Sequence, residues 1–387
     1  MELVELDSVC EIIAGQSPPS SSYNQDEVGV PFFQGKADFG RINPTVRYWC
    51  TEPKKMSVIN DILFSVRAPV GSTNVNNIEA SIGRGLAAIR CNKEIDLQFL
   101  LHYLRANEER IANMGTGSTF KAITIKTLKS IKIPLPPLPT QKKIASILDE
   151  ADTLRQLNKQ LITKYDALTQ SLFLEMFGDT WLNPKGWEMK LVEELALDKK
   201  HSIKAGPFGS SLKKDYYVEK GYKIYGQEQV IKDDLSFGDY YIDTEKYESL
   251  KSCKVQAGDI LISLVGTYGK IAIVPQKFEE GIINPRLMKI SPNQKIIKPD
   301  FFKMLLQGSG ALIQMKSKSR GGTMDIVNVG IMRKIKVPLP PINLQNQFAE
   351  RANIIQQQKA QAQQSLQKSE DLFNSLLQKA FKGELVK

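Results

Sequence analysis

The chain has 387 residues, of which 42% are hydrophobic, so it is long enough for two or three domains with packed cores and is not a disordered polypeptide. Its formal net charge is +10 and its pI is about 9.2, which favours a polyanionic partner without proving one. No segment approaches the ~20 apolar residues of a membrane span.

Cysteine usage and the first residues point to a reducing compartment. Cys10, Cys50, Cys91 and Cys253 lie far apart and form no Cys-x-x-Cys pair. Residues 1–5 are acidic and lack the basic and apolar regions of a secretory signal. We therefore expect reduced thiols in a cytoplasmic protein that makes no membrane contact.

Charge and proline content divide the chain into four segments. We predict a first globular domain over residues 1–133, a proline-rich lead-in with a long helix over 134–178, a second globular domain over 179–337, and a second lead-in with a helix over 338–387. Their net charges are +1, 0, +7 and +2, so the second globular segment holds most of the excess. The neutral charge of the first long helix suits a segment that binds protein.

The first globular segment has the mixed pattern of an α/β domain. Residues 62–66 are a short apolar run that predicts a buried strand, and residues 97–110 have helical spacing. Residues 14–29 are rich in Gly, Pro, Ser and Tyr. They predict a long loop, and loops of that length in a compact domain usually carry function.

The first long helix is introduced by prolines. Residues 131–141 are Ile-Lys-Ile-Pro-Leu-Pro-Pro-Leu-Pro-Thr-Gln, and Thr140 is a candidate N-cap for a helix that reaches Phe177. Apolar residues then recur in alternating steps of three and four, which predicts a coiled-coil seam with one register-fixing polar residue. The predicted seam is Ile144, Ile147, Ala151, Leu154, Asn158, Leu161, Tyr165, Leu168 and Leu172.

The second half of the chain repeats the first. Residues 335–345 are Ile-Lys-Val-Pro-Leu-Pro-Pro-Ile-Asn-Leu-Gln, and Asp61-Ile-Leu-Phe-Ser recurs as Asp259-Ile-Leu-Ile-Ser. The second helix has a weaker seam, interrupted by Lys359 and Ser369, that comprises Phe348, Ala352, Ile355, Ala362, Leu366, Phe373 and Leu376. One unit has therefore been duplicated. We expect an α+β protein in which two pseudo-repeated α/β domains are separated by two long helices that form an antiparallel coiled coil.

These features together resemble the specificity (S) subunit of type I restriction-modification systems. The resemblance rests on the duplicated Pro-Leu-Pro-Pro-x-x-x-Gln lead-ins, on the loop Ala205-Gly-Pro-Phe-Gly-Ser-Ser-Leu-Lys213 and its weaker counterpart Ala14-Gly-Gln-Ser-Pro-Pro19, and on the Gly-x-Thr loop before each final strand. It implies two target recognition domains that each read one half of a split, asymmetric double-stranded DNA target. It also implies helices that set the spacer and dock two methyltransferase (M) subunits, which nuclease-translocase (R) subunits can join.

The chemistry of such a complex is missing from this chain. It has no Asn-Pro-Pro-aromatic motif for adenine methylation, no glycine motif placed to bind S-adenosylmethionine and no phosphate-binding loop for ATP. His102 and His201 have no partners at metal-ligand spacing. We expect a non-catalytic binding protein without cofactors. The resemblance implies that S-adenosylmethionine belongs to the M subunits, and that ATP and Mg belong to the R subunits.

Candidate DNA contacts are basic, amide and hydroxyl side chains in loops, because phosphates attract cations while amides and arginines read base edges. In the first domain we predict Gln16, Ser17, Tyr23, Gln34, Lys36, Arg67, Thr119 and Lys121. In the second we predict Lys204, Phe208, Ser210, Ser211, Lys213, Lys214, Gln227, Gln229, Lys316, Lys318, Arg320, Gly322 and Thr323. Two domains held apart by helices can read half-sites ~34–36 Å apart.

Other classes of function remain open. Duplicated domains also suit a protein–protein scaffold, although the +7 segment argues against it. A stand-alone DNA-binding regulator needs no M subunit, and the neutral helix would then lack a role. An enzyme with an unrecognised site is the third alternative. The target bases and the spacer length do not follow from the sequence.

Overall fold

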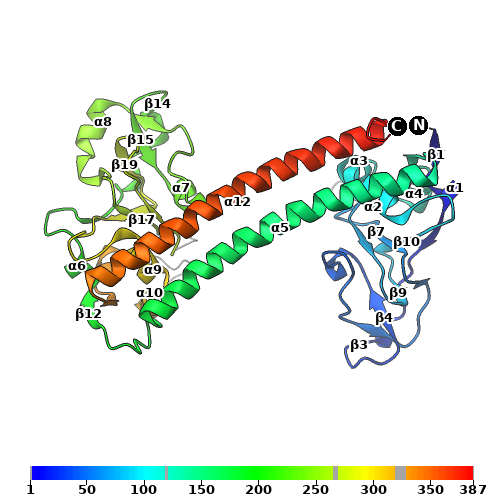
Figure 1. The fold of residues 1–387 in the computed structure, drawn as a ribbon, viewed down its shortest axis with the longest axis horizontal. Coiled ribbons are helices and arrows are strands. Elements are labelled where there is room, and N and C mark those ends of the chain that lie inside the picture. The colour runs from blue at the N-terminus through cyan, green and yellow to red at the C-terminus, as the bar shows by residue number, and fades with distance from the viewer. Residues whose placement is uncertain (1, 118–120, 265–268, 319–327, 387) are drawn as a thin grey trace. The chain divides into compact units, whose positions relative to one another are not determined.

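The computed structural model describes residues 2–117, 121–264, 269–318 and 328–386. The chain divides into two compact units, which are Met1–Gln160 with Ala362–Lys387, and Leu161–Gln361. Helices α5 (Leu138–Phe177) and α12 (Ile342–Lys382) each contribute one part to either unit. Figure 1 shows the strands of the first unit in blue to cyan and those of the second in green to orange.

The first unit is built on two sheets joined by their strand connections. A four-stranded antiparallel sheet has the order β2-β10-β7-β8, with β2 at Cys10–Ala14, β10 at Leu86–Cys91, β7 at Ile62–Ser65 and β8 at Thr73–Val75. A five-stranded sheet has the order β3-β5-β4-β9-β6, with β3 at Tyr23–Asn24, β5 at Trp49–Cys50, β4 at Val30–Phe33, β9 at Ala80–Ile82 and β6 at Met56–Ser57.

The remaining elements of the first unit close the chain against α5. Strand β1 (Leu3–Glu5) pairs antiparallel with β11 (Lys132–Pro134), directly before the helix. The helices are α1 at Leu6–Val9, α2 at Leu97–Ala106, α3 at Glu108–Ala112 and α4 at Ile125–Lys129, with 3-10 turns η1 at Ser20–Ser22 and η2 at Lys36–Asp38.

The second unit repeats this plan with different lengths. Its four-stranded antiparallel sheet β13-β20-β17-β18 has β13 at Ile203–Ala205, β20 at Leu287–Ile290, β17 at Ile260–Ser263 and β18 at Ile271–Ile273. The second sheet, β14-β16-β15-β19, has β14 at Tyr217–Val218, β16 at Tyr241–Ile242, β15 at Tyr222–Tyr225 and β19 at Gly281–Ile283. Strand β12 (Glu188–Leu191) pairs with β21 (Lys336–Leu339) as β1 pairs with β11.

The second unit has more helices than the first among the described residues. They are α6 at Val192–Leu195, α7 at Gln227–Lys232, α8 at Thr244–Ser249, α9 at Pro299–Gln307, α10 at Ser309–Lys318 and α11 at Val329–Arg333, with 3-10 turns η3 at Gly209–Ser211, η4 at Lys214–Tyr216 and η5 at Lys251–Cys253. The mixed fold with two repeated domains and two long helices confirms the predicted fold class. The single helix expected at 97–110 is broken at Asn107.

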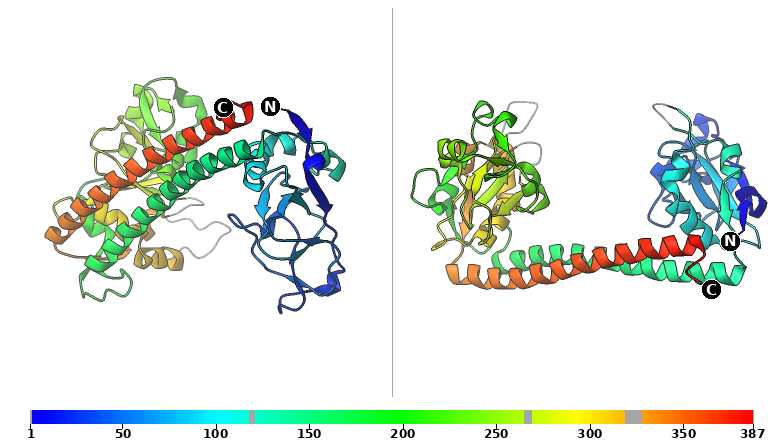
Figure 2. Two further views of the ribbon diagram at one scale, coloured as in Figure 1. Left: turned by 45° about the vertical axis from the view of Figure 1, so that its right-hand side comes forward. Right: turned by 90° about the horizontal axis from the view of Figure 1, so that it is seen from above.

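The two long helices run antiparallel in each unit (Figure 2). In the first unit, Asn158 Nδ2 lies 3.4 Å from Ser369 Oγ, and Lys159 pairs with Glu370 at 3.1 Å. In the second unit, Lys359 pairs with Asp166 at 2.5 Å, and Phe173 and Phe177 pack their rings on Phe348. As residue numbers increase along α5, the residues opposite them on α12 have decreasing numbers, so the helices are antiparallel.

The predicted seam of α5 is wrong at every second position. Leu154, Leu161 and Leu168 are 48%, 39% and 49% exposed, and Ile147 is only half-buried. The residues that face inward at these places are one position later, at Leu148, Arg155, Ile162 and Thr169. From Ile144 onward, the spacing between inward residues alternates four and three, where the apolar pattern predicts three and four. Arg155 fills such a position by laying its guanidinium over the Phe373 ring at 4.3 Å.

The other seam positions lie on the inner face of their helices. On α5, Ile144 and Ala151 are buried, and Asn158, Tyr165 and Leu172 are half-buried. On α12, Phe348, Ala362 and Phe373 are buried, while Ala352, Ile355, Leu366 and Leu376 are half-buried. Ser369 is buried opposite Asn158, so one polar residue of each seam meets the other in the first unit.

Helix α5 begins two residues before the predicted N-cap. It starts at Leu138, and the Thr140 N–H donates to the Pro137 carbonyl, so Thr140 is not the cap. Pro139 therefore lies inside the first helical turn, where a missing N–H costs nothing because no carbonyl is available for it. Only Pro134, Pro136 and Pro137 precede the helix.

A buried glutamine locks each helix to its domain. Gln141 is fully buried, accepts from the Asp96 N–H at 2.8 Å, and donates to the carbonyls of Glu94 and Pro136. Gln345 repeats this bonding with the Lys298 N–H and the carbonyls of Ile296 and Pro340. The final Gln of both Pro-Leu-Pro-Pro-x-x-x-Gln motifs thus fixes where the helix leaves the domain.

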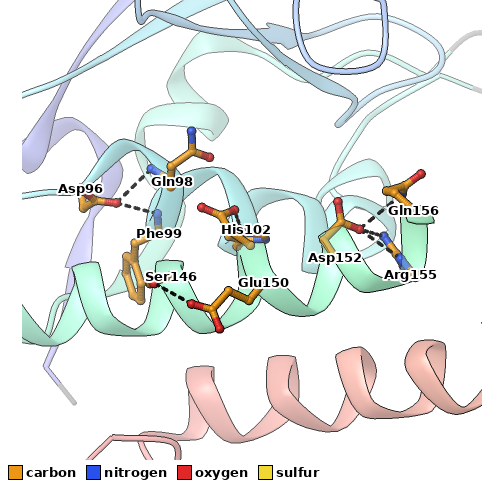
Figure 3. A network of polar contacts seen from close by, with 10 residues as sticks. Asp96, Gln98, Phe99, His102, Ser146, Glu150, Asp152, Arg155 and Gln156 are labelled. Atoms are coloured by element: carbon orange, nitrogen blue, oxygen red, sulfur yellow. Dashed lines mark hydrogen bonds and ion pairs between the residues drawn. The ribbon is translucent and has the colours of Figure 1, made fainter. Parts of the chain in front are cut away.

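Polar contacts add to this anchor in the first unit (Figure 3). The buried His102 of α2 places Nε2 2.7 Å from the Asp149 carboxylate of α5. Asp96 caps α2 by accepting from the N–H groups of Gln98 and Phe99 at 3.0 Å. Beside them, Asp152 pairs with Arg155 on α5. His102 therefore has a structural partner.

Candidate nucleic-acid interface

In the first unit, the ends of four strands converge on one tight turn. Residues 83–85 join β9 to β10, and the Gly83 N–H donates to the Phe33 carbonyl at the end of β4 at 2.8 Å. The Gly85 carbonyl accepts from the Val66 N–H after β7, and the Gly15 N–H after β2 donates to the Leu86 carbonyl. The loops at 15–18, 34–36 and 66–69 are therefore gathered around this turn.

The second unit makes the same hydrogen bonds. The Asn284 N–H donates to the Tyr225 carbonyl at 2.8 Å, the Leu264 N–H to the Arg286 carbonyl at 3.0 Å, and the Gly206 N–H to the Leu287 carbonyl at 2.8 Å. Residues 206–208, 226–227, 263–264 and 284–286 thus correspond to the gathered loops of the first unit. We call each set the strand-end face of its unit.

Glycine is required where the first loop of each face begins. A Cβ at Gly15 would collide with the carbonyl oxygens of Gly83 and Leu86, and one at Gly206 would collide with the Asn284 carbonyl. Backbone therefore packs directly on backbone, and the loop that follows starts from a fixed point.

The strand-end face of the first unit presents cationic and amide side chains. Gln16, Ser17, Gln34, Lys36 and Arg67 are all exposed, as predicted contacts must be. The Ser17 Oγ accepts from the Arg84 N–H at 3.3 Å, which joins the first loop to the central turn.

Two predicted DNA contacts of the first unit make hydrogen bonds within the protein. Lys121 is exposed and donates to Asn113 Oδ1 at 3.1 Å, next to Ala122, which bridges to Arg67. Tyr23 is half-buried, donates its hydroxyl to the Pro18 carbonyl at 2.9 Å and packs on Phe32. Tyr23 therefore supports the loop at 15–18 from below. Thr119 lies outside the described residues.

The second unit presents a different set of side chains. Phe208 is 89% exposed, and Ser210, Lys213 and Lys214 are exposed beyond it. Ser211 and Lys204 are half-buried, as is Gln227, whose Nε2 donates to Ser263 Oγ at 2.8 Å. Lys316 is exposed on α10. The side chain of Lys318 and the predicted Arg320, Gly322 and Thr323 lie outside the described residues.

Gln229 is wrongly predicted as a DNA contact. Its side chain is only 2% exposed, accepts from the Gly226 N–H at 2.9 Å and donates to the Ile224 carbonyl. These bonds satisfy backbone groups at the start of α7, and burial keeps the amide out of reach of a base. The sequence could not separate it from Gln227, because both are polar residues of one short helix.

An arginine at the centre of each face was not predicted from the sequence. Arg84 and Arg286 are exposed in the turns 83–85 and 284–286, and in the described part of the chain neither pairs with a carboxylate; the same holds for Arg67. The available clue was an arginine beside Gly or Pro between two apolar runs in both repeats.

Ion pairs lie at the other ends of the strands that form the two faces. Asp61 pairs with Arg90 at 2.9 Å in the first unit, and the buried Asp259 pairs with the buried Lys289 at 3.4 Å in the second. Burial lowers the pKa of Lys289, an effect that Asp259 opposes, and the Lys223 ammonium lowers the pKa of Glu279.

Within the described residues, no group of three or more His, Cys, Asp or Glu side chains could hold a metal ion. No described helix is long and apolar enough to cross a membrane. The strand-end faces offer loop side chains and backbone N–H groups on a fixed scaffold, which suits recognition of an extended anionic surface.

Comparison with known proteins gives consistent matches along the chain. The family model of the type I restriction modification DNA specificity domain matches residues 1–164 and 184–376. The EcoBI specificity subunit of Escherichia coli is 24% identical over 410 residues, covering 99% of this chain and 85% of that protein.

A second relative is more similar over a shorter length. The putative MjaX specificity subunit of Methanocaldococcus jannaschii is 50% identical over 162 residues, which are 41% of this chain and 38% of that relative. Among solved structures, the S subunit of a type I restriction-modification system from M. genitalium is 18% identical, covers 98% of this chain and 96% of its own, and superposes with a TM-score of 0.59. This likeness supports the fold.

Proposed function

The chain belongs to the type I restriction modification DNA specificity family, and from this we propose that it is the specificity subunit of a type I restriction-modification complex. The observation that carries the proposal is the strand-end face, which occurs twice on the same backbone scaffold with cationic and amide side chains. We infer that each unit reads one half of a split double-stranded DNA target.

The two faces differ, so the target is asymmetric. Gln16, Gln34 and Arg84 offer two amides and an arginine in the first unit. The second unit offers one arginine, Arg286, and one amide, Gln227. It also presents the aromatic ring of Phe208, where the first unit has Ser17. Arginine pairs bidentately with guanine and glutamine with adenine, while lysines such as Lys36 and Lys213 contact phosphates.

The chemical steps belong to partner subunits in this proposal. S-adenosylmethionine would be bound by two methyltransferase subunits, and ATP and Mg by nuclease-translocase subunits, while this chain has no catalytic role. Exposed leucines on α5 support protein docking, because they are not used between the helices. They are Leu154 and Leu157 in the first unit, and Leu161 and Leu168 in the second.

The paired helices would set the unread spacer between the half-sites. Adding one heptad to α5 after Asn158 and one to α12 before Ser369 lengthens each helix by ~10.5 Å. We predict that the spacer of the recognised motif grows by about three base pairs, at ~3.4 Å per base pair. Base-resolved methylation mapping would measure it, and an unchanged spacer in a folded, active variant would reject the role as a ruler.

Methylation mapping also tests the proposal as a whole. Cells would express the cognate methyltransferase subunit with or without this chain, and adenine methylation would be read at base resolution. We expect one split, asymmetric motif that appears only when this chain is present. Identical methylation in both cultures, or a stable complex without methylation, would favour a scaffold or a stand-alone regulator instead.

A further inference from the structure

Phe208 is the most exposed large hydrophobic side chain among the described residues, at 89%. Single exposed apolar residues are common and need no explanation by themselves. This ring is different because it stands on the strand-end face of the second unit, two residues beyond the glycine that fixes the loop to the central turn.

The backbone on both sides of Phe208 is held. The Gly206 N–H donates to the Leu287 carbonyl at 2.8 Å, and Pro207 is buried and restricts its own φ. On the other side, the Phe208 carbonyl accepts from the Ser211 N–H at 2.8 Å, and Leu212 is buried. The backbone that carries the ring is therefore already ordered before anything binds.

The surroundings of Phe208 suit DNA more than protein. Ser210 is exposed two residues after it, and Lys213 and Lys214 are exposed a few residues further on. Arg286 is exposed on the turn that receives the Gly206 bond. An apolar ring between small residues and cations can enter a base step while the cations hold the phosphates.

We propose that Phe208 is a wedge that inserts between base pairs of the half-site read by the second unit, unstacking one step and bending the duplex there. This proposal rests on the proposed function. In the first unit, the backbone alignment of Gly15 with Gly206 puts Ser17 at the corresponding position. Ser17 cannot act as a wedge, so only one half-site is deformed.

The experiment uses the full-length chain with its methyltransferase subunits and duplexes that carry the mapped target. 2-Aminopurine, which brightens on unstacking, replaces single bases in either half-site, away from the methylated adenines. Donor and acceptor dyes at the duplex ends report bending. The variants are Phe208→Ala, Phe208→Leu and, as a control for loss of an exposed apolar group, Leu182→Ala, which removes a side chain that is 75% exposed.

We expect the wild-type complex to brighten 2-aminopurine at one half-site only and to bend the duplex. Phe208→Ala should abolish both signals and weaken binding about 10- to 100-fold, the range of a lost base–aromatic stack. Phe208→Leu should keep most of each signal, because leucine also serves as a wedge. Leu182→Ala should match the wild type.

Three outcomes would overturn the wedge. The wedge is excluded if the complex with Phe208→Ala unstacks and bends DNA as the wild-type complex does. In a second outcome, Phe208→Ala loses the methyltransferase subunits in gel filtration, while the fluorescence and bending signals of each bound duplex stay unchanged. Phe208 would then be a residue that docks protein. Specific binding without any unstacking by the wild type overturns the wedge and keeps the proposed function, whereas no specific binding at all overturns both.

Discussion

Residues 83–86 of the first unit and 284–287 of the second make matching backbone hydrogen bonds, yet the exposed side chains around them differ. Arg84 lies between two glycines, while Arg286 follows Asn284 and Pro285. Ser17 in one face stands where Phe208 stands in the other. Main-chain bonding therefore supplies the shape of the face, and the side chains are free to set which bases it reads.

The ion pairs at the other ends of the strands that form the faces should show the largest difference between the two units. Asp259→Asn should cost ~3–5 kcal/mol, because it leaves the ammonium of Lys289, 4% exposed, without a partner. Asp61→Asn should cost less, because Arg90 is 35% exposed and can be solvated. Urea unfolding measures both.

The exposed Asp198 provides a matched control for these two variants. Asp198→Asn should stay within ~0.5 kcal/mol of the wild type. Equal losses for Asp61→Asn and Asp259→Asn would contradict the difference between the two pairs.

The buried glutamines should behave alike in the two units. Gln141→Ala and Gln345→Ala each leave one N–H and two carbonyls unsatisfied, which should cost ~2–4 kcal/mol. Hydrogen exchange should show the loss in the unit that carries the change. Gln160→Ala, at an exposed position of α5, is the control. If Gln141 and Gln345 acted only through helix propensity, their alanine variants would lose no more stability than Gln160→Ala.

Alkaline pH should lower the stability of the second unit more than that of the first, because the second has the titratable Tyr225 where the first has Phe33. Burial, with Glu279 nearby, raises the pKa of Tyr225 to about 12. Its folded-state pKa exceeds the unfolded value of ~10, so its contribution is complete below pH ~10 and is lost between pH ~10 and 12.

We expect the second unit to lose up to ~1.4 kcal/mol per pH unit through Tyr225 in this range, a slope that Tyr225→Phe removes. Unfolding followed at pH 9, 10 and 11 would measure it. Burial and Glu280 also raise the pKa of Tyr247, so some dependence should remain in the variant. Greater alkaline sensitivity of the first unit would contradict this account.

Much of the architecture follows from the sequence because it is carried by repeated local patterns. The prolines, the heptad-like spacing and the Asp-Ile-Leu-x-Ser runs predict two domains and two helices. The phase of the α5 seam does not follow, because Leu154, Leu161 and Leu168 are as apolar as the residues that are buried. Only packing selects Arg155 over its leucine neighbour.

The site follows from the sequence only in part. Loop composition predicted the long loop at 14–29, which begins the face of the first unit, because Gly, Pro and Ser mark it. Arg84 and Arg286 were missed since their importance comes from hydrogen bonds between distant strands. Gln229 and Gln227 look alike in sequence, and only the fold shows that one amide is spent on backbone groups.

The most direct test of the central claim is methylation mapping with Arg84→Gln and Arg286→Gln, each co-expressed with the methyltransferase subunit. Each variant should lose ~1–3 kcal/mol of discrimination at one position and relax the motif there. The account predicts that the two relaxed positions fall in opposite half-sites while the other half stays unchanged. Relaxation of the same half by both variants, or of both halves by either, would contradict independent reading by the two units.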